Sequence, residues 1–400
     1  MQNASFFRRD RKVKQYLDEL KGMNSFEKSI LLAVASLFLP FQYASLVLGI
    51  ILVYALWKGK LIQAIQKQPG AIWLYSFVVL EILVSMFYQN WIGLLNAFGY
   101  LGIALFVAYY RDHINPKLFQ YMLTEIIFLS IFSAIYGLYE FKLVSEHSGY
   151  SFFDFKIQEK PQDRINSTFM NANFYATICE FVIVFCLYKF IRTSKIRMRC
   201  TYLLIATLNF LMILLTGCRT ALLPFLFIFL AFFWLCKEKR WFGFSAIMES
   251  LALLVVSQFP TLIPRITNMK TFGSRMKIWK TAFQAIPMHP MLGQGPQTYG
   301  FVYKSLHGHK APHAHNIYID SILSFGWIGT LIGIGYFLSL WKEIRQYKMY
   351  KSDPYVFPMI VCFIIIALVH GLLDCTLNFV ATGIIFMIIL NSCSQFKNSI

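Results

Sequence analysis

The chain has 400 residues, of which 57% are hydrophobic and only 14% are charged. Because a soluble domain carries about 25% charged residues, this composition excludes an ordinary soluble globular protein. The formal net charge of +18 is a topology signal in so apolar a chain, since Lys and Arg stay on the cytoplasmic side of membrane spans. We therefore expect no nucleic-acid partner.

Apolar runs of membrane-spanning length recur from end to end and predict an all-α polytopic membrane protein in contact with membrane lipids. We expect about 12 transmembrane helices, over residues 28–40, 43–57, 71–88, 91–110, 118–140, 171–190, 201–216, 220–236, 242–260, 316–341, 354–372 and 376–393. The first two are short and could instead form one re-entrant pair.

The basic residues predict which segments face the cytoplasm. With the N-terminus inside, the cytoplasmic segments hold 25 of the 37 Lys and Arg, in agreement with the positive-inside rule. The expected parts are a basic cytoplasmic tail 1–27, helices one to nine within 28–260 with an outer loop 141–170, a large extracytoplasmic loop 261–315, helices ten to twelve within 316–393, and a cytoplasmic tail 394–400.

The large loop between helices nine and ten is rich in cations and imidazoles. From Thr261 to His315 there is no Asp or Glu, whereas the same span contains seven Lys or Arg and five of the eight His. A long segment outside the membrane with this composition is suited to holding an anion.

Two arginines are candidate anion ligands. Apolar spacing predicts a helix from Ser274, as N-cap, to Ile286, with Arg275 on the same side as the apolar face that includes Phe283. Arg219 follows a Thr-Gly break at the outer start of a span. A guanidinium at a helix start favours a bound phosphate; snorkelling of Arg275 to lipid headgroups, or an ion pair of Arg219 with Asp374, are the alternatives.

His315 lies at a third outward helix start and is a candidate general base. The pairs His307-x-His309 and His313-x-His315 resemble metal ligands, but zinc sites are usually completed by Cys or carboxylate, which this loop lacks. We therefore expect no metal and no other cofactor. A histidine that only caps the helix is a further alternative.

Other polar and small residues in the spans have structural interpretations. Gly326, Gly329 and Gly333 would leave one side of the tenth helix thin for close packing. Asp320 and Asp374, expected near the outer face, could orient His315 or bind sugar hydroxyls. The eight Cys show no paired spacing and are interpreted as packing residues.

At these motifs the chain resembles the bacterial O-antigen ligase and polysaccharide polymerase superfamily. The match consists of His315-Asn316 followed by Gly326 and Gly329, the blocks G-S-R-M-K-I-W and M-H-P-M-L-G-Q-G, T-G-C-R-T-A at the head of a span, and S-T-F-M-N-A-N-F-Y. The resemblance covers about residues 164–333 and implies a metal-independent transferase of the bacterial cytoplasmic (inner) membrane.

The family implies a polyprenyl-pyrophosphate-linked oligosaccharide as donor. By this resemblance Arg219 and Arg275 correspond to pyrophosphate-binding arginines, and His315 to the residue that assists the acceptor hydroxyl in a catalytic loop 261–315. We group as further substrate-binding candidates His313, Asn316, Arg265, Lys277, Arg164, Asn171 and Asn173.

Three functions remain open at this point. The first is a polymerase of capsule or lipopolysaccharide repeat units, favoured by the block H-P-M-L-G-Q-G; the second is an O-antigen ligase that uses lipid A–core as acceptor. The third is a transporter or flippase of lipid-linked glycans, which should show inverted repeats and a midplane site. Other polysaccharide-assembly proteins are further candidate partners.

Overall fold

In a computed structural model, which describes residues 18–19, 21–153, 163–260, 263, 270–347 and 353–396, the described chain is all helical, without strands. The first helices are α2 (Ser25–Ser36), α3 (Phe41–Trp57), α4 (Lys60–Gln66), α5 (Ala71–Phe87), α6 (Trp91–His113), α7 (Pro116–His147), α8 (Ala172–Arg192) and α9 (Ile196–Thr216). They are followed by η2 (Arg219–Leu222), α10 (Phe225–Leu235), α11 (Lys239–Gln258), α12 (Lys270–Ala285), η4 (Ile286–Met288), α13 (Thr298–Val302), α14 (Ile317–Tyr347), α15 (Val356–His370), η6 (Thr376–Asn378), α16 (Val380–Leu390) and η7 (Ser392–Phe396).

Every expected span coincides with one helix or with adjoining helices, but the count of 12 is not confirmed. Six described helices are long and apolar enough to cross a membrane. The axes of α3 and α4 differ by 91°, so this pair is either a broken span or a re-entrant loop and raises the number to at most seven. Shorter apolar helices include α5 and α15.

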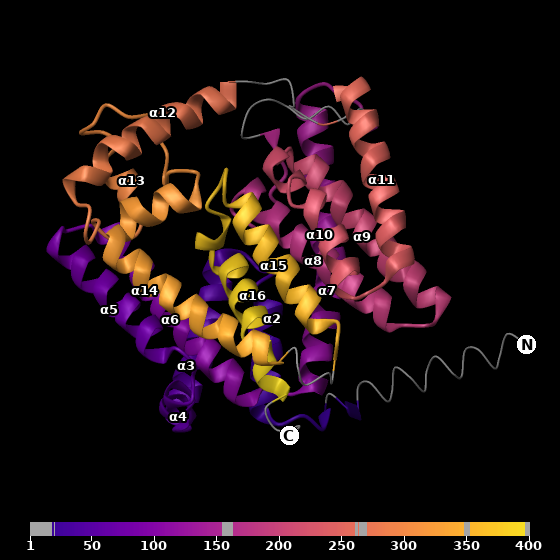
Figure 1. Cartoon of the computed structure of the whole chain (residues 1–400), viewed down its shortest axis with the longest axis horizontal. Helices are drawn as coiled ribbons and strands as arrows, with labels where there is room; N and C mark the ends of the chain where they lie inside the picture. The colour runs from indigo at the N-terminus through magenta and orange to yellow at the C-terminus, as the bar shows by residue number, and fades with distance from the viewer. Residues whose placement is uncertain are drawn as a thin grey trace, which may run out of the picture.

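The bundle is organised around α8, which is the most deeply buried candidate span, with 78% of its most apolar window inside the protein. It packs against α7, α9 and α15. By contrast α11 lies at the edge of the bundle (Figure 1), and Ser245 is its only buried residue. A helix that is apolar on its exposed sides is suited to contact with lipid.

Three ion pairs join helix ends that are distant in the sequence. Arg111 pairs with Glu343 at 2.8 Å, Arg192 with Asp353 at 2.8 Å, and Lys67 with Asp112 at 3.0 Å. These residues come from, or adjoin, segments that the charge pattern assigns to the cytoplasm. The fold therefore brings these separate basic segments to one face.

At the other end, the loop before α13 inserts into a break in α14. Gly326 has φ +60° and ψ −172°, which interrupts the helix. The amides of Trp327 and Ile328, freed by the break, donate to the carbonyls of Pro290 and Met291 at 2.9 Å. A Cβ on Gly326 would lie 2.4 Å from the Met291 backbone, so this glycine is required where the loop crosses the helix.

The close packing expected at all three glycines of α14 is wrong for one of them. A Cβ on Gly329 would lie 2.8 Å from Glu81, so that position is tightly packed, as expected. A Cβ on Gly333 would meet nothing within 4 Å. Gly333 instead borders a cavity.

Labelling of introduced cysteines tests the assignment of the two faces. In a Cys-free background, an impermeant maleimide added from outside should modify Ser305→Cys, in the loop after α13, but not Ser194→Cys, between α8 and α9. Both positions are exposed, so access alone decides the result. Labelling of Ser194→Cys alone would show that the topology is the inverse of the one predicted.

Candidate functional site

The site begins with the turn that starts α14. The Asn316 side-chain oxygen accepts hydrogen bonds from the backbone amides of Tyr318 and Ile319 at 3.0 Å, and its amide donates to the Leu372 carbonyl at 2.8 Å. Asn316 is therefore the helix cap. The interpretation of His315 as a simple cap is wrong, and the His315 side chain is available for another partner.

That partner is Asp374, which follows α15. Nδ1 of His315 lies 3.0 Å from Oδ1 of Asp374. Because a carboxylate only accepts hydrogen bonds, Nδ1 carries the hydrogen, and Nε2 of the neutral ring keeps its lone pair. Burial alone would raise the pKa of Asp374, but its hydrogen bond with His315 holds the pKa well below its ordinary value. The pair is thus an oriented base with an ionised partner.

His315 is held in a backbone conformation that L-residues rarely adopt. Its φ is +49°, and a left-handed residue other than glycine costs on the order of 1–3 kcal/mol. The preceding Ala314 is held on both sides, because its amide donates to Oδ1 of Asp320 at 2.8 Å and its carbonyl accepts from Nε1 of Trp279 at 3.0 Å. These two bonds fix the loop that presents the imidazole.

Arg164 is tied to the same carboxylate through Asn173. The Asn173 amide donates to Oδ2 of Asp374, and its oxygen accepts from Nη2 of Arg164 at 2.5 Å. Nε of Arg164 donates to the Thr216 carbonyl at 2.7 Å. Burial lowers the pKa of Arg164; Cys218 and Asp374 oppose this shift, and the nearby charge of Arg275 adds to it.

Arg219 completes a group of three arginines. α9 ends at Gly217 in the left-handed region, with φ +60°, and Arg219 starts η2 directly afterwards. This agrees with the expected Thr-Gly break. Arg219 is half-buried and lies within electrostatic range of Arg275 and Arg164. We call Arg164, Arg219 and Arg275 the arginine group; its like charges favour a bound anion.

Arg275 reaches this group from α12. The helix begins at Lys270 and not at Ser274, so the expected N-cap is wrong. Its buried side includes Ile278 and Ala282, and Arg275 is half-buried beside them, as the helical spacing predicted. The side chain of Phe283 is 59% exposed and does not belong to this side, contrary to expectation.

A buried dyad that the sequence did not single out lies behind Arg219. Nδ1 of His370 is 2.9 Å from Oε2 of Glu180, and its Nε2 is 3.0 Å from the hydroxyl of Thr220. The amide of Asp374 donates to the His370 carbonyl at 3.1 Å. His370 therefore connects the turn of Arg219 with the segment that carries Asp374.

The remaining predicted residues are placed less uniformly. His313 is buried, with Nε2 3.9 Å from Asp374; burial lowers its pKa to about 4 although Asp374 opposes the shift, so it is neutral near pH 7. Asn171 caps α8 from an exposed position. Lys277 is exposed on α12. Arg265 lies outside the described residues.

Among the described residues, His313, His315 and Asp374 form a group that could hold a metal ion, with their ligand atoms all within 4.8 Å. The loop itself contains no carboxylate, but the fold brings Asp374 to it from elsewhere in the chain. A metal ion there would replace the hydrogen bond between His315 and Asp374. It would also lie close to the charge of Arg275, which disfavours a cation.

These features define a helical membrane protein with a cationic, imidazole-containing site at one end of its bundle. The family model described as O-Antigen ligase matches residues 203–334, from α9 into α14. This match confirms the predicted resemblance to the O-antigen ligase and polysaccharide polymerase superfamily. The family indicates a glycan-transferring membrane enzyme with a lipid-linked glycan donor and a glycan acceptor.

The matched segment is about a third of the chain and includes Arg219, Arg275 and His315. Arg164, Asn173 and Asp374 lie outside it. No curated protein matches the chain. The contacts described above therefore extend the site beyond the segment that the family comparison covers.

Trp279→Phe tests whether the bond to the Ala314 carbonyl positions His315. The change keeps an aromatic ring but removes the N–H donor, so activity should fall about tenfold, which corresponds to one hydrogen bond. The thermal midpoint should change little. Trp241→Phe, at the start of α11, is the control. Equal transfer rates in the two variants would contradict the positioning role.

Proposed function

We propose that the protein is a membrane glycosyltransferase that polymerises cell-surface polysaccharide repeat units at the outer face of the bacterial cytoplasmic membrane, with both termini cytoplasmic. Its donor is a polyprenyl-pyrophosphate-linked glycan. The observation that carries the proposal is the arginine group beside the His315–Asp374 pair. Membership of the matched segment in a glycan-transferring family supports it.

The chemistry follows from these contacts. Nε2 of His315 accepts the proton of the acceptor hydroxyl as its oxygen forms a bond to the anomeric carbon. The bond between that carbon and the pyrophosphate oxygen breaks, and polyprenyl pyrophosphate leaves with the electron pair. The arginine group stabilises the charge on the leaving group, a role that metal ions have in other enzymes.

A transporter is less well supported. Its substrate site would lie near the middle of the bundle, between repeats, whereas the arginine group sits next to helix ends and loops: Gly217 precedes Arg219, and Asn173 and Asp374 hold Arg164. Of the two transfer reactions, we favour polymerisation because the block at His289 to Gly295 is typical of polymerase-like members. The ligase reaction is the second outcome of the assay below.

The deciding experiment supplies purified protein with lipid-linked repeat units alone. Chains that lengthen without another acceptor support polymerase, whereas transfer that requires added lipid A–core would identify a ligase.

A chelator should leave the transfer rate unchanged, because the arginine group acts on the pyrophosphate. Loss of activity that a divalent cation restores would contradict the metal-independent step.

Arg219→Lys tests the pyrophosphate assignment. Lysine keeps the charge but loses the planar pair of donors, so kcat should fall about 100-fold, as for loss of a transition-state donor. Arg197→Lys is the matched control, because Arg197 is exposed at the start of α9. Normal output from Arg219→Lys, at an abundance equal to that of the control, would refute the assignment.

A further inference from the structure

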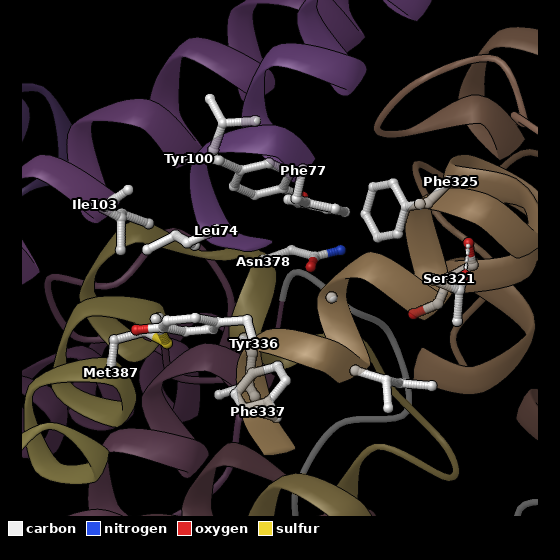
Figure 2. Close-up of a pocket in the computed structure, with 18 of the residues that line it drawn as sticks. Leu74, Phe77, Tyr100, Ile103, Ser321, Phe325, Tyr336, Phe337, Asn378 and Met387 are labelled. Carbon is white, nitrogen blue, oxygen red and sulfur yellow. Dashed lines mark hydrogen bonds between the residues drawn. The ribbon is translucent and has the colours of Figure 1, made fainter. Parts of the chain in front are cut away.

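An apolar cavity of about 290 Å³ lies between α5, α6, α14 and α16. Figure 2 shows Phe77 and Phe325 at one side and Tyr336 and Phe337 at the other, with the Asn378 amide between them. A volume near 300 Å³ is at the lower end of the range of ligand pockets. The lining is mostly aliphatic and aromatic, so the cavity suits an apolar occupant.

The outer end of this cavity adjoins the functional site. Ile317, which lines it, is the first residue of α14 and lies two positions after His315. Asn378, also in the lining, ends η6, four positions after Asp374. The two segments that hold the base and its carboxylate therefore also line the cavity.

The cavity is lined by both halves of α14. Its lining residues on this helix run from Ile317 to Phe337, on either side of the break at Gly326. Met387 of α16 also lines the cavity, on the side away from Ser321 (Figure 2). A lining drawn from four helices of the bundle, almost all of it apolar, suits a hydrocarbon chain that lies between them.

Gly333 keeps the cavity open. A glycine within a helix lowers the stability of the helix by about 1 kcal/mol relative to alanine. Close packing against another helix is a common reason for such a glycine. Here a Cβ would meet nothing within 4 Å. The missing side chain therefore leaves space in the cavity.

We propose that this cavity binds the isoprenoid chain of the donor lipid, whose pyrophosphate is held at the arginine group. The inference rests on the proposed function for the identity of the chain. Continuity with His315 and Asp374 favours the donor over a bulk membrane phospholipid, since the chain that enters beside the base is the one attached to the reacting pyrophosphate. Gly333 then determines how much of that chain is accommodated.

Photolabelling tests binding without requiring transfer. The probe is a polyprenyl pyrophosphate with a diazirine on its third isoprene unit, added to full-length protein in nanodiscs. Crosslinks should map to cavity residues of α14 and α16, and unlabelled polyprenyl pyrophosphate should compete, whereas phosphatidylglycerol should not. Equal competition by phosphatidylglycerol, or crosslinks elsewhere, would overturn the proposal.

The series Gly333→Ala and Gly333→Leu tests the space itself. Gly99→Leu is the control, because Gly99 is an exposed helical glycine of α6 with nothing within 4 Å of its Cβ position. Labelling should fall stepwise, about tenfold for leucine if two methylene-sized contacts are lost, and remain in the control. Ala is the second variant if leucine disturbs folding; unchanged labelling in both well-folded variants would overturn the proposal.

Kinetics separates this inference from the proposed function. With a long-chain donor, Gly333→Leu should raise KM about tenfold, and with the same glycan pyrophosphate on a short alkyl chain it should match the wild type. Equal losses with both donors would indicate damage to the site and overturn the cavity assignment. If the wild type transfers neither glycan, the proposed function fails, and the photolabelling result alone decides whether the cavity binds the chain.

Discussion

The hydrogen bond between His315 and Asp374 is the contact on which the site depends, because it joins segments that are distant in the sequence. Asp374 also accepts from Asn173, which in turn holds Arg164. One ionised carboxylate therefore orients the imidazole and, through one amide, an arginine. Without this carboxylate, the cations at this end of the bundle would repel one another, and nothing would fix their arrangement. The position of this carboxylate explains how the site remains ordered although most of its charged groups are cations.

Neighbouring side chains stabilise the strained backbone conformation of His315. His315 adopts a left-handed backbone conformation. The side chains of Trp279 and Asp320 form hydrogen bonds with the backbone of Ala314, the residue before it. Behind Arg219, the buried His370–Glu180 dyad holds the hydroxyl of Thr220. Charged and strained groups are thus held by buried side chains of α8, α14 and α15 and by the half-buried Trp279 of α12, which is the support that a preorganised site requires.

Features with local causes were predictable from the sequence. Apolar runs located the helices, the Thr-Gly pair located the turn before Arg219, and helical spacing placed Arg275 on the buried side of its helix. Contacts across the bundle were not predictable: His315 and Asp374 are 59 residues apart, and His370 and Glu180 are 190 apart. The Gly333 prediction failed because the spacing of small residues does not reveal whether another helix lies opposite them.

The insertion of the loop before α13 into the break in α14 has a consequence for local unfolding of the protein. The amides of Trp327 and Ile328 have their partners in the loop, and the amide of Gly295 donates back to the Ser324 carbonyl at 3.0 Å. Separating the two would leave backbone groups without partners in an apolar environment, at a cost of several kcal/mol for each group. Loop and helix therefore form one cooperative unit, and hydrogen exchange at these amides reports a single shared opening.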